Sequence, residues 1–285
     1  MTKALISAAH KSSGKTCVAT GLIAALSEQG LQIQPFKKGP DYIDPKWLSK
    51  AAGRPCFNLD FNTQEDDEII QIFDTHRADL NLIEGNKGLY DGVDIEGANS
   101  NAALARLLDI PIVLVLDCEG STRGIAPLLL GYKSFDTKIN FLGVILNKVG
   151  GTRHESKLRG VVERYTDFSI LGCVPRCSEM HLKERHLGLK PANEDSYAEK
   201  KIEGIKNIIQ NNVSLDIFVE LSAKSNKTIK TKPKQKKEYQ GLKIGYIFDE
   251  SFGFYYPDDI ESFSHHGAEL VAIDALRDSS LPNID

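Results

Sequence analysis

The chain has 285 residues, of which 41% are hydrophobic and 26% charged, as is ordinary for a globular protein. Its formal net charge of −4 gives no reason to expect nucleic acid or an anionic membrane as a partner. No apolar run approaches the ~20 residues that a membrane-spanning helix needs. Five scattered cysteines and an N-terminus without a signal-peptide pattern favour the reducing cytoplasm.

The first residues carry a phosphate-binding pattern. Apolar residues 4–9 predict a strand, residues 17–29 predict a helix, and the turn between them ends in Gly-Lys-Thr. In a P-loop, backbone N–H groups hold phosphate oxygens, the lysine reaches the outer phosphates and the threonine ligates Mg²⁺. The predicted nucleotide contacts are Ser12, Ser13, Gly14, Lys15, Thr16 and Cys17. The usual first glycine is Ala9 here, and a helix N-cap without a ligand is the alternative.

The next segments alternate between two patterns. Apolar runs at 80–83, 110–116 and 141–146 lack alternation, as is typical of strands buried on both faces of a parallel sheet. Helical patterns occupy residues 17–29, 66–75, 99–108, 125–133 and 155–165. Together they predict an α/β fold with a doubly wound, mostly parallel sheet, whose site lies at the carboxyl ends of the strands.

Two acidic clusters follow predicted strands. Asp41 and Asp44 lie in a Gly/Pro-rich segment, residues 34–45, that we expect to be a loop and not helix or central strand. Glu84 follows the run at 80–83, and Asp91 comes seven residues later. Carboxylates, a hydroxyl and phosphates are ligands that Mg²⁺ prefers, so Thr16, Asp44 and Glu84 are its predicted ligands. Ordinary turn acids are the alternative interpretation.

Two further patterns are weaker. Asn147 follows the run at 141–146, where P-loop folds contact the nucleotide base. Cys173, Cys177, His181 and His186 are residue types that bind zinc, but their compact spacing differs from that of closed zinc sites, and we expect no zinc.

The chain changes character after Ile217. Residues 224–237 contain seven lysines and no periodicity, which predicts a solvated linker, with a nucleic-acid-binding tail as the alternative. Apolar runs at 242–248 and 268–273, with a helical pattern at 258–266, then predict the opening of a second α/β unit. The expected domains are therefore 1–220, a linker at 221–241, and 242–285.

Four separate motifs, at residues 34–45, 84–92, 143–147 and 184–189, together resemble the cobyrinic acid a,c-diamide synthase family. These enzymes are glutamine-dependent amidotransferases related to dethiobiotin synthetase in their ATP domain. The resemblance covers residues 3–200. It resumes at 243–282, where the sequence is similar to the start of a class I glutaminase domain. It implies ATP- and Mg²⁺-dependent amidation of tetrapyrrole carboxylates, and a homodimer.

The resemblance also implies residue roles. Lys15, Lys37, Asp41 and Asp91 match positions used in catalysis, and Asp44 and Glu84 complete the metal site. The implied substrate contacts are Lys87, Tyr90, Arg185 and His186.

Two departures keep alternatives open. None of the cysteines matches the glutaminase nucleophile, so we expect free ammonia, a separate glutaminase, or an incomplete homologue that only binds. The residues Glu-Gly-Asn-Lys-Gly at 84–88 resemble relatives that amidate sirohaem instead of cobyrinic acid. A partitioning-type P-loop ATPase is the rival from another class, but it needs a lysine where this chain has His10.

Overall fold

The computed structural model describes residues 2–182, 184–185, 188–189, 192, 197–223 and 239–285. Seven of the described strands form one parallel sheet in the order β3-β2-β4-β1-β5-β6-β7. They are β1 (Thr2–Ala8), β2 (Ile33–Lys38), β3 (Phe57–Leu59), β4 (Leu80–Glu84), β5 (Ile112–Asp117), β6 (Phe141–Val149) and β7 (Ile170–Pro175). The predicted α/β class and parallel sheet are confirmed.

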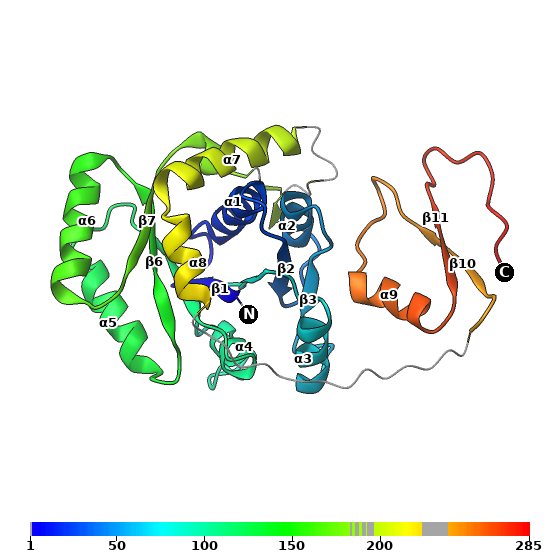
Figure 1. The fold of residues 1–285 in the computed structure, drawn as a ribbon, viewed down its shortest axis with the longest axis horizontal. Coiled ribbons are helices and arrows are strands. Elements are labelled where there is room, and N and C mark those ends of the chain that lie inside the picture. Colours follow the sequence, from blue (N-terminus) through cyan, green and yellow to red (C-terminus); the bar gives the residue numbers. More distant parts are fainter. Residues whose placement is uncertain (1, 183, 186–187, 190–191, 193–196, 224–238) are drawn as a thin grey trace.

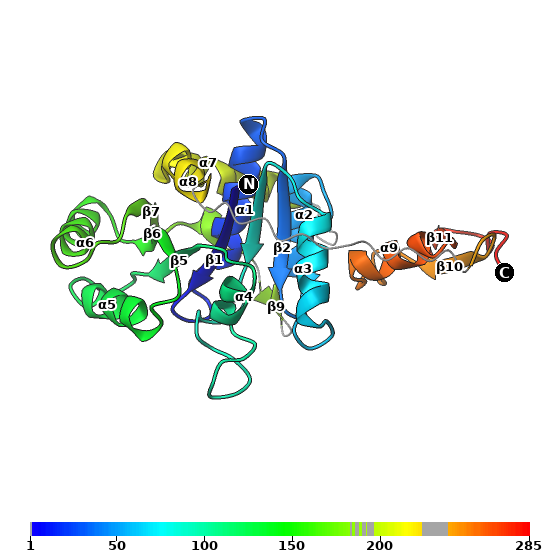
Figure 2. The ribbon, with the colours of Figure 1, turned by 60° about the horizontal axis from the view of Figure 1, so that its bottom comes forward.

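Helices cover both faces of this sheet (Figures 1 and 2). One face packs against α1 (Lys15–Glu28), α2 (Asp44–Ala52), α7 (Ala198–Asn212) and α8 (Leu215–Ala223). The other face packs against α3 (Asp66–Thr75), α4 (Asn101–Leu107), α5 (Ile125–Phe135) and α6 (Thr152–Tyr165). The sheet therefore separates two apolar clusters, and its strands are buried on both sides, as the unbroken apolar runs predict.

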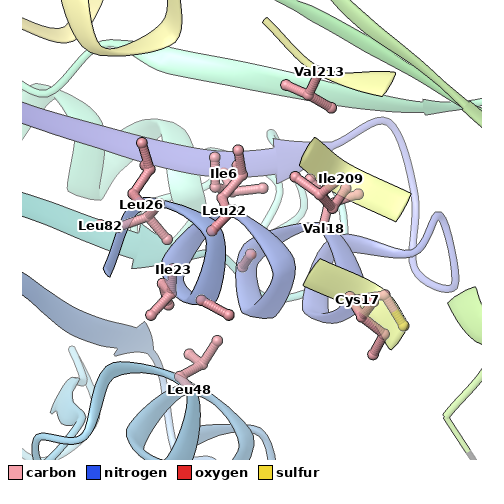
Figure 3. Close-up of a cluster of buried hydrophobic side chains, with 14 of the residues drawn as sticks. Ile6, Cys17, Val18, Leu22, Ile23, Leu26, Leu48, Leu82, Ile209 and Val213 are labelled. Carbon is pink, nitrogen blue, oxygen red and sulfur yellow. The ribbon is translucent and has the colours of Figure 1, made fainter. Parts of the chain in front are cut away.

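Helix α1 begins within the predicted phosphate-binding turn, residues 9–16, and is buried along most of its length. Leu22 and Leu26 lie against the sheet, while Ile23 points to Leu48 of α2 (Figure 3). Gly21 allows α7 to approach closely, because a Cβ at this position would lie 2.3 Å from Cγ1 of Ile209. This packing fixes the helix whose first turn holds the site.

The expectation that residues 34–45 form a loop is wrong at both ends. Residues 34–38 belong to β2, an interior strand in which Pro35 pairs with Leu82. Proline removes only one ladder donor, and the strand continues on either side of it. Asp44 is the first residue of α2, with Pro45 in the first turn, where a missing N–H has no cost. Only residues 39–43 form the connection.

The second unit is a β-α-β segment. It comprises β10 (Lys243–Ile247), α9 (Pro257–His265) and β11 (Glu269–Ile273), with the two strands parallel. It lies beside α2, α3 and β3 (Figure 1). The ring of Tyr42 stacks on that of Tyr256 with centroids 4.7 Å apart, and Nε2 of Gln64 donates to Asp258 over 3.2 Å. The predicted linker falls largely on residues 224–238, outside the described residues, so the domain boundaries stay a prediction.

No helix among the described residues is long and apolar enough to cross a membrane.

Candidate active site

The phosphate-binding turn lies at the carboxyl end of β1, between β4 and β5. Ser12 and Gly14 have positive φ angles of 63° and 89°, which turn the backbone toward the first turn of α1. An open cavity of about 950 Å³ adjoins the turn, and Gly14, Lys15, Thr16, Lys37 and Glu84 line it. This volume is in the range of small-molecule and cofactor sites.

The turn is held from β6. Asn147 donates from Nδ2 to the carbonyl of Ser13 over 2.8 Å, and a Cβ on Gly14 would lie 2.3 Å from that nitrogen. Lys148 donates from Nζ to the carbonyl of Ser12 over 3.1 Å and to Oδ2 of Asp117 over 2.6 Å. Lys148 does so with a φ of 57°, an unusual conformation for a non-glycine residue. Sequence reasoning missed Lys148, although it directly follows Asn147.

The remaining residues of the turn are tied to nearby backbone. Nζ of Lys15 donates to the carbonyl of Lys87 over 2.6 Å, and burial lowers the pKa of Lys15 to about 8. The hydroxyl of Ser13 donates to the carbonyl of His10 over 2.8 Å. The thiol of Cys17 donates to the carbonyl of Met180, and burial raises its pKa to about 12. Cys17 is therefore a neutral thiol and not a nucleophile.

The structure brings both acidic clusters to Thr16. The Thr16 hydroxyl lies 2.6 Å from Oε1 of Glu84 and 3.4 Å from Oδ2 of Asp44. Lys37, fully buried at the end of β2, places Nζ 2.6 Å from Asp44, 3.2 Å from Glu84 and 3.6 Å from Asp41. One hydroxyl, three carboxylates and one ammonium group thus meet beside the phosphate-binding turn.

The charges of this cluster depend on one another. Burial raises the pKa of Glu84 to about 7, although Lys37 acts in the opposite direction. Burial alone would raise the pKa of Asp44, but the Lys37 ammonium holds it below its ordinary value. Burial alone would lower the pKa of Lys37, but the carboxylates, Asp44 foremost, raise it above its ordinary range. The Lys37 ammonium thus offsets part of the negative charge of the three carboxylates.

The residues present fit a Mg²⁺ ion. Oε2 of Glu84 is buried and has no hydrogen-bond partner among the described residues. Such an atom carries a desolvation penalty unless a ligand satisfies it. Within the described part of the chain, no group of three or more His, Cys, Asp or Glu side chains has the arrangement of a metal site. A Mg²⁺ site with one or two carboxylates, a hydroxyl, phosphates and water does not need such a group.

A buried amide shapes the loop after β4. Asn101, at the start of α4, donates from Nδ2 to the carbonyls of Asn86 and Gly88 over 2.5 and 3.0 Å and accepts from the Asn86 N–H. A Cβ on Gly85 would lie 2.8 Å from this side chain, so the loop can follow it closely. Sequence reasoning missed Asn101, because nothing in the pattern of its helix indicates which loop it contacts.

The other predicted substrate and catalytic residues lie in different places. Lys87 lines the cavity. Asp91 accepts from the Gly88 N–H over 2.9 Å, and its side chain is exposed. Tyr90 donates to the carbonyl of Tyr132 over 2.6 Å and packs against α5, so it is not brought to the cavity. Arg185 lies in β8 (Glu184–Arg185), which pairs with β9 (Gly188–Leu189), and His186 lies outside the described residues.

A family comparison agrees with this geometry. Residues 6–189 match the sequence profile described as the CobQ/CobB/MinD/ParA nucleotide binding domain. The chain belongs to this family. The partitioning-type alternative shares the same profile and is not separated by it.

Curated relatives that match nearly the whole chain share one name. The chain is 44% identical over 98% of its length to a cobyrinate a,c-diamide synthase of Magnetococcus marinus, covering 62% of that protein. Relatives of the same name from Methanosarcina barkeri and Listeria innocua are 38% and 37% identical, with 60% and 64% of their lengths covered. The predicted resemblance is confirmed, and the chain spans less than two thirds of these relatives.

Solved structures with a similar fold are more distant. The septum site-determining protein MinD of Pyrococcus horikoshii, complexed with Mg-ADP, is 17% identical with a TM-score of 0.40, over 79% of this chain and 96% of that one. The cell division protein FtsY of Thermotoga maritima is 14% identical with a TM-score of 0.45, over 72% and 68%. The fold assignment therefore rests on the sheet order of this chain and the family profile.

Proposed function

We propose that this chain binds ATP and Mg²⁺ and activates carboxylates of a tetrapyrrole for amidation, as the names of its curated relatives suggest. The observation that carries the proposal is the meeting of Thr16, Asp44, Glu84 and Lys37 beside the phosphate-binding turn. A nucleotide-driven switch needs the turn and the metal ligands. It gives no role to Asp41, or to the cations that line the cavity beyond the turn.

The first step is phosphoryl transfer. A substrate carboxylate oxygen attacks the γ-phosphorus of ATP, the bond to the bridging oxygen breaks, and ADP leaves. Lys15 and Lys37 place positive charge beside the oxygens on which negative charge develops. Lys15 leaves the carbonyl of Lys87 to reach the phosphates, and its lowered pKa reflects how little water surrounds it.

Thr16, Asp44 and Glu84 would hold Mg²⁺, which when bound neutralises phosphate charge. Glu84 is suited to this role because Oε2 is buried without a partner among the described residues, while Oε1 contacts Thr16. Lys37 holds the carboxylates of Asp44 and Glu84 close together.

The second step forms the amide. Ammonia attacks the carbonyl carbon of the acyl phosphate, inorganic phosphate leaves, and one proton is lost from nitrogen. Asp41, whose pKa is raised by burial, lies at the edge of the cavity and is our candidate to accept that proton. Asp91 supports the step indirectly, because it holds the Gly88 N–H in the loop whose Lys87 carbonyl contacts Lys15. Ammonia, free or released from glutamine, would supply the nitrogen.

Trapping the intermediate tests this proposal. Hydroxylamine converts an acyl phosphate to a hydroxamate, so the chain incubated with ATP, Mg²⁺, hydroxylamine and cobyrinic acid should form a hydroxamate of the macrocycle. A parallel reaction with sirohaem tests the second candidate substrate. ATP hydrolysis without either macrocycle, and no hydroxamate with either, would instead favour the partitioning-type ATPase.

A further inference from the structure

A second cavity lies between the two units of the chain. It has a volume of about 720 Å³ and is bounded on one side by α2 and on the other by the loop that follows β10. Asp41 and Tyr42 line both this cavity and the one at the phosphate-binding turn, so the two meet at the connection between β2 and α2. We call it the inter-unit cavity.

One wall of the inter-unit cavity is basic. Lys46, Lys50 and Arg54 follow one another at intervals of four residues along α2 and just beyond its end, and all three line the cavity. Lys46 and Lys50 lie one turn apart on one face of α2, and Arg54 follows the left-handed Gly53 that ends the helix. Like charges at this spacing repel each other, and an anionic ligand would offset that repulsion.

The opposite wall is aromatic. The rings of Phe248 and Tyr255 both line the cavity, and each packs against Tyr246, with centroids 6.1 and 5.7 Å apart. Tyr255 is fixed further by a hydrogen bond of 2.9 Å to the carbonyl of Ile247. The half-exposed Phe248 offers an apolar surface across from the basic wall.

All three acids that line the inter-unit cavity have partners, and Asp41 accepts from the backbone N–H groups of Ile43 and Asp44. Asp249 accepts from the backbone N–H groups of Ser251, Phe252 and Ala275. Glu250 pairs with Arg277 over 2.6 Å. On the basic wall, the partner of Lys50 is Glu199, whose side chain is 87% exposed, and an ion pair so exposed contributes little. The lining of the cavity includes four basic side chains (Lys46, Lys50, Arg54 and Arg277) and three acidic ones (Asp41, Asp249 and Glu250), so its formal charge is positive.

We propose that the inter-unit cavity binds the body of a flat, polycarboxylated macrocycle, with its rings against Phe248 and its carboxylates along Lys46, Lys50 and Arg54. This inference rests on the proposed function, and it adds the place in the structure where the macrocycle binds. The carboxylate to be activated then passes Tyr42 into the cavity at the phosphate-binding turn. The remaining carboxylates stay on α2, away from the nucleotide.

The test measures cobyrinic acid binding to the whole chain without nucleotide. Trp47, the single tryptophan, lies in α2 with its side chain buried in the core, and a tetrapyrrole bound near α2 should quench its fluorescence. The double variant Lys50→Gln/Arg54→Gln should weaken binding about tenfold at low salt, and much less in about 0.5 M salt, where charges are screened. Phe248→Ala should weaken binding by a similar factor at both salt concentrations.

The matched control is Lys157→Gln/Arg164→Gln, which removes one lysine and one arginine from the exposed face of α6. Calorimetric binding of ADP shows that each variant is folded. If the control and the Lys50/Arg54 variant bind cobyrinic acid as tightly as the original chain does, the macrocycle binds elsewhere, and this inference is wrong while the proposed function stands. If the original chain binds neither cobyrinic acid nor sirohaem, the proposed function fails with it.

Discussion

The Thr16 hydroxyl lies 2.6 Å from Oε1 of Glu84, a residue 68 positions later in the chain. The contact joins the first turn of α1 to the end of β4, two elements that the parallel sheet places side by side. It leaves Oε2 of Glu84 buried with no partner among the described residues. The pair thus marks where a cation and the phosphates would meet.

Replacing Glu84 tests the metal site. Glu84→Gln keeps the size of the side chain and an oxygen for Thr16 but removes one negative charge. We expect the Mg²⁺ concentration for half-maximal ATP turnover to rise about tenfold, which corresponds to about 1.4 kcal/mol. The control is Glu163→Gln on the exposed surface of α6. An unchanged Mg²⁺ requirement in Glu84→Gln would remove this residue from the metal site.

Lys15 tests the phosphate-binding turn. Lys15→Ala removes an ammonium group whose contacts in the structure are with the carbonyls of Lys87 and His10, not with an acid in the core. We expect turnover to fall by about 100-fold or more, because a charge that stabilises the transition state is lost. The thermal midpoint should stay close to that of the control Lys157→Ala. Full turnover in Lys15→Ala would overturn the assignment of the turn.

Replacing Lys148 tests whether its hydrogen bonds to Ser12 and Asp117 support nucleotide binding at that turn. Lys148→Asn keeps a residue that tolerates positive φ but removes the ammonium group between Asp117 and the Ser12 carbonyl. We expect ADP to bind about tenfold more weakly, because the loop loses a charged hydrogen bond. Calorimetry measures this directly, with Lys138→Asn as an exposed control. Equal ADP affinity in both variants would show that the hydrogen bonds of Lys148 have no effect on nucleotide binding.

The contact between the two units predicts a dependence on pH. Burial raises the pKa of Asp258 to about 6, and its Oδ1 has no partner among the described residues. The folded state therefore binds this proton more tightly than the unfolded chain does, and that contribution to stability is lost as the pH rises through about 6. In Asp258→Asn the side chain cannot ionise, so the variant does not lose this contribution to stability as the pH rises.

Urea unfolding at about pH 5 and pH 7.5 measures the effect. From about pH 5 to pH 7.5, the free energy of unfolding of Asp258→Asn should rise relative to that of the original chain by about 1 kcal/mol, once solvent screening is included. The neighbouring exposed Asp259→Asn should gain much less, because burial is the main cause of the raised pKa of Asp258 and the Asp259 charge is a smaller one. Burial lowers the pKa of His76 to about 4, which acts in the opposite sense, but His76 is present in all three proteins and cancels. Equal pH dependence in all three would contradict the account of Asp258.

The sequence predicted the elements best where local signals agreed. The helix predicted at 66–75 has those bounds in the structure, because a capping box between Glu65 and Glu68 marks its start. The Gly/Pro-rich pattern of residues 34–45 predicts a loop, yet residues 34–38 form a strand, because pairing with β3 and β4 outweighs the one ladder donor that Pro35 lacks. The conformational preference of one proline is thus outweighed by the hydrogen bonds that the strand forms with its two neighbours.

Some residues of the candidate site could likewise be predicted from the sequence, and others could not. Thr16 and Glu84 follow predicted strands, which indicates that they meet, because parallel strands share a carboxyl edge. Asp44 joins them at the same edge because β2, which the sequence did not predict, ends at Lys38. Lys148 and Asn101 escaped prediction, because each acts on a distant loop through contacts that only the folded sheet creates. The stack of Tyr42 on Tyr256 was equally invisible, since it joins the two units across more than two hundred residues.

The most direct measurement is ATP turnover by the purified chain with Mg²⁺ and ammonium chloride, with and without cobyrinic acid or sirohaem, followed by mass spectrometry of the macrocycle. We expect ATP turnover that depends on a macrocycle, and a product about one mass unit lighter for each carboxyl converted to carboxamide. ATP turnover that no macrocycle stimulates, with no change in macrocycle mass, would contradict it.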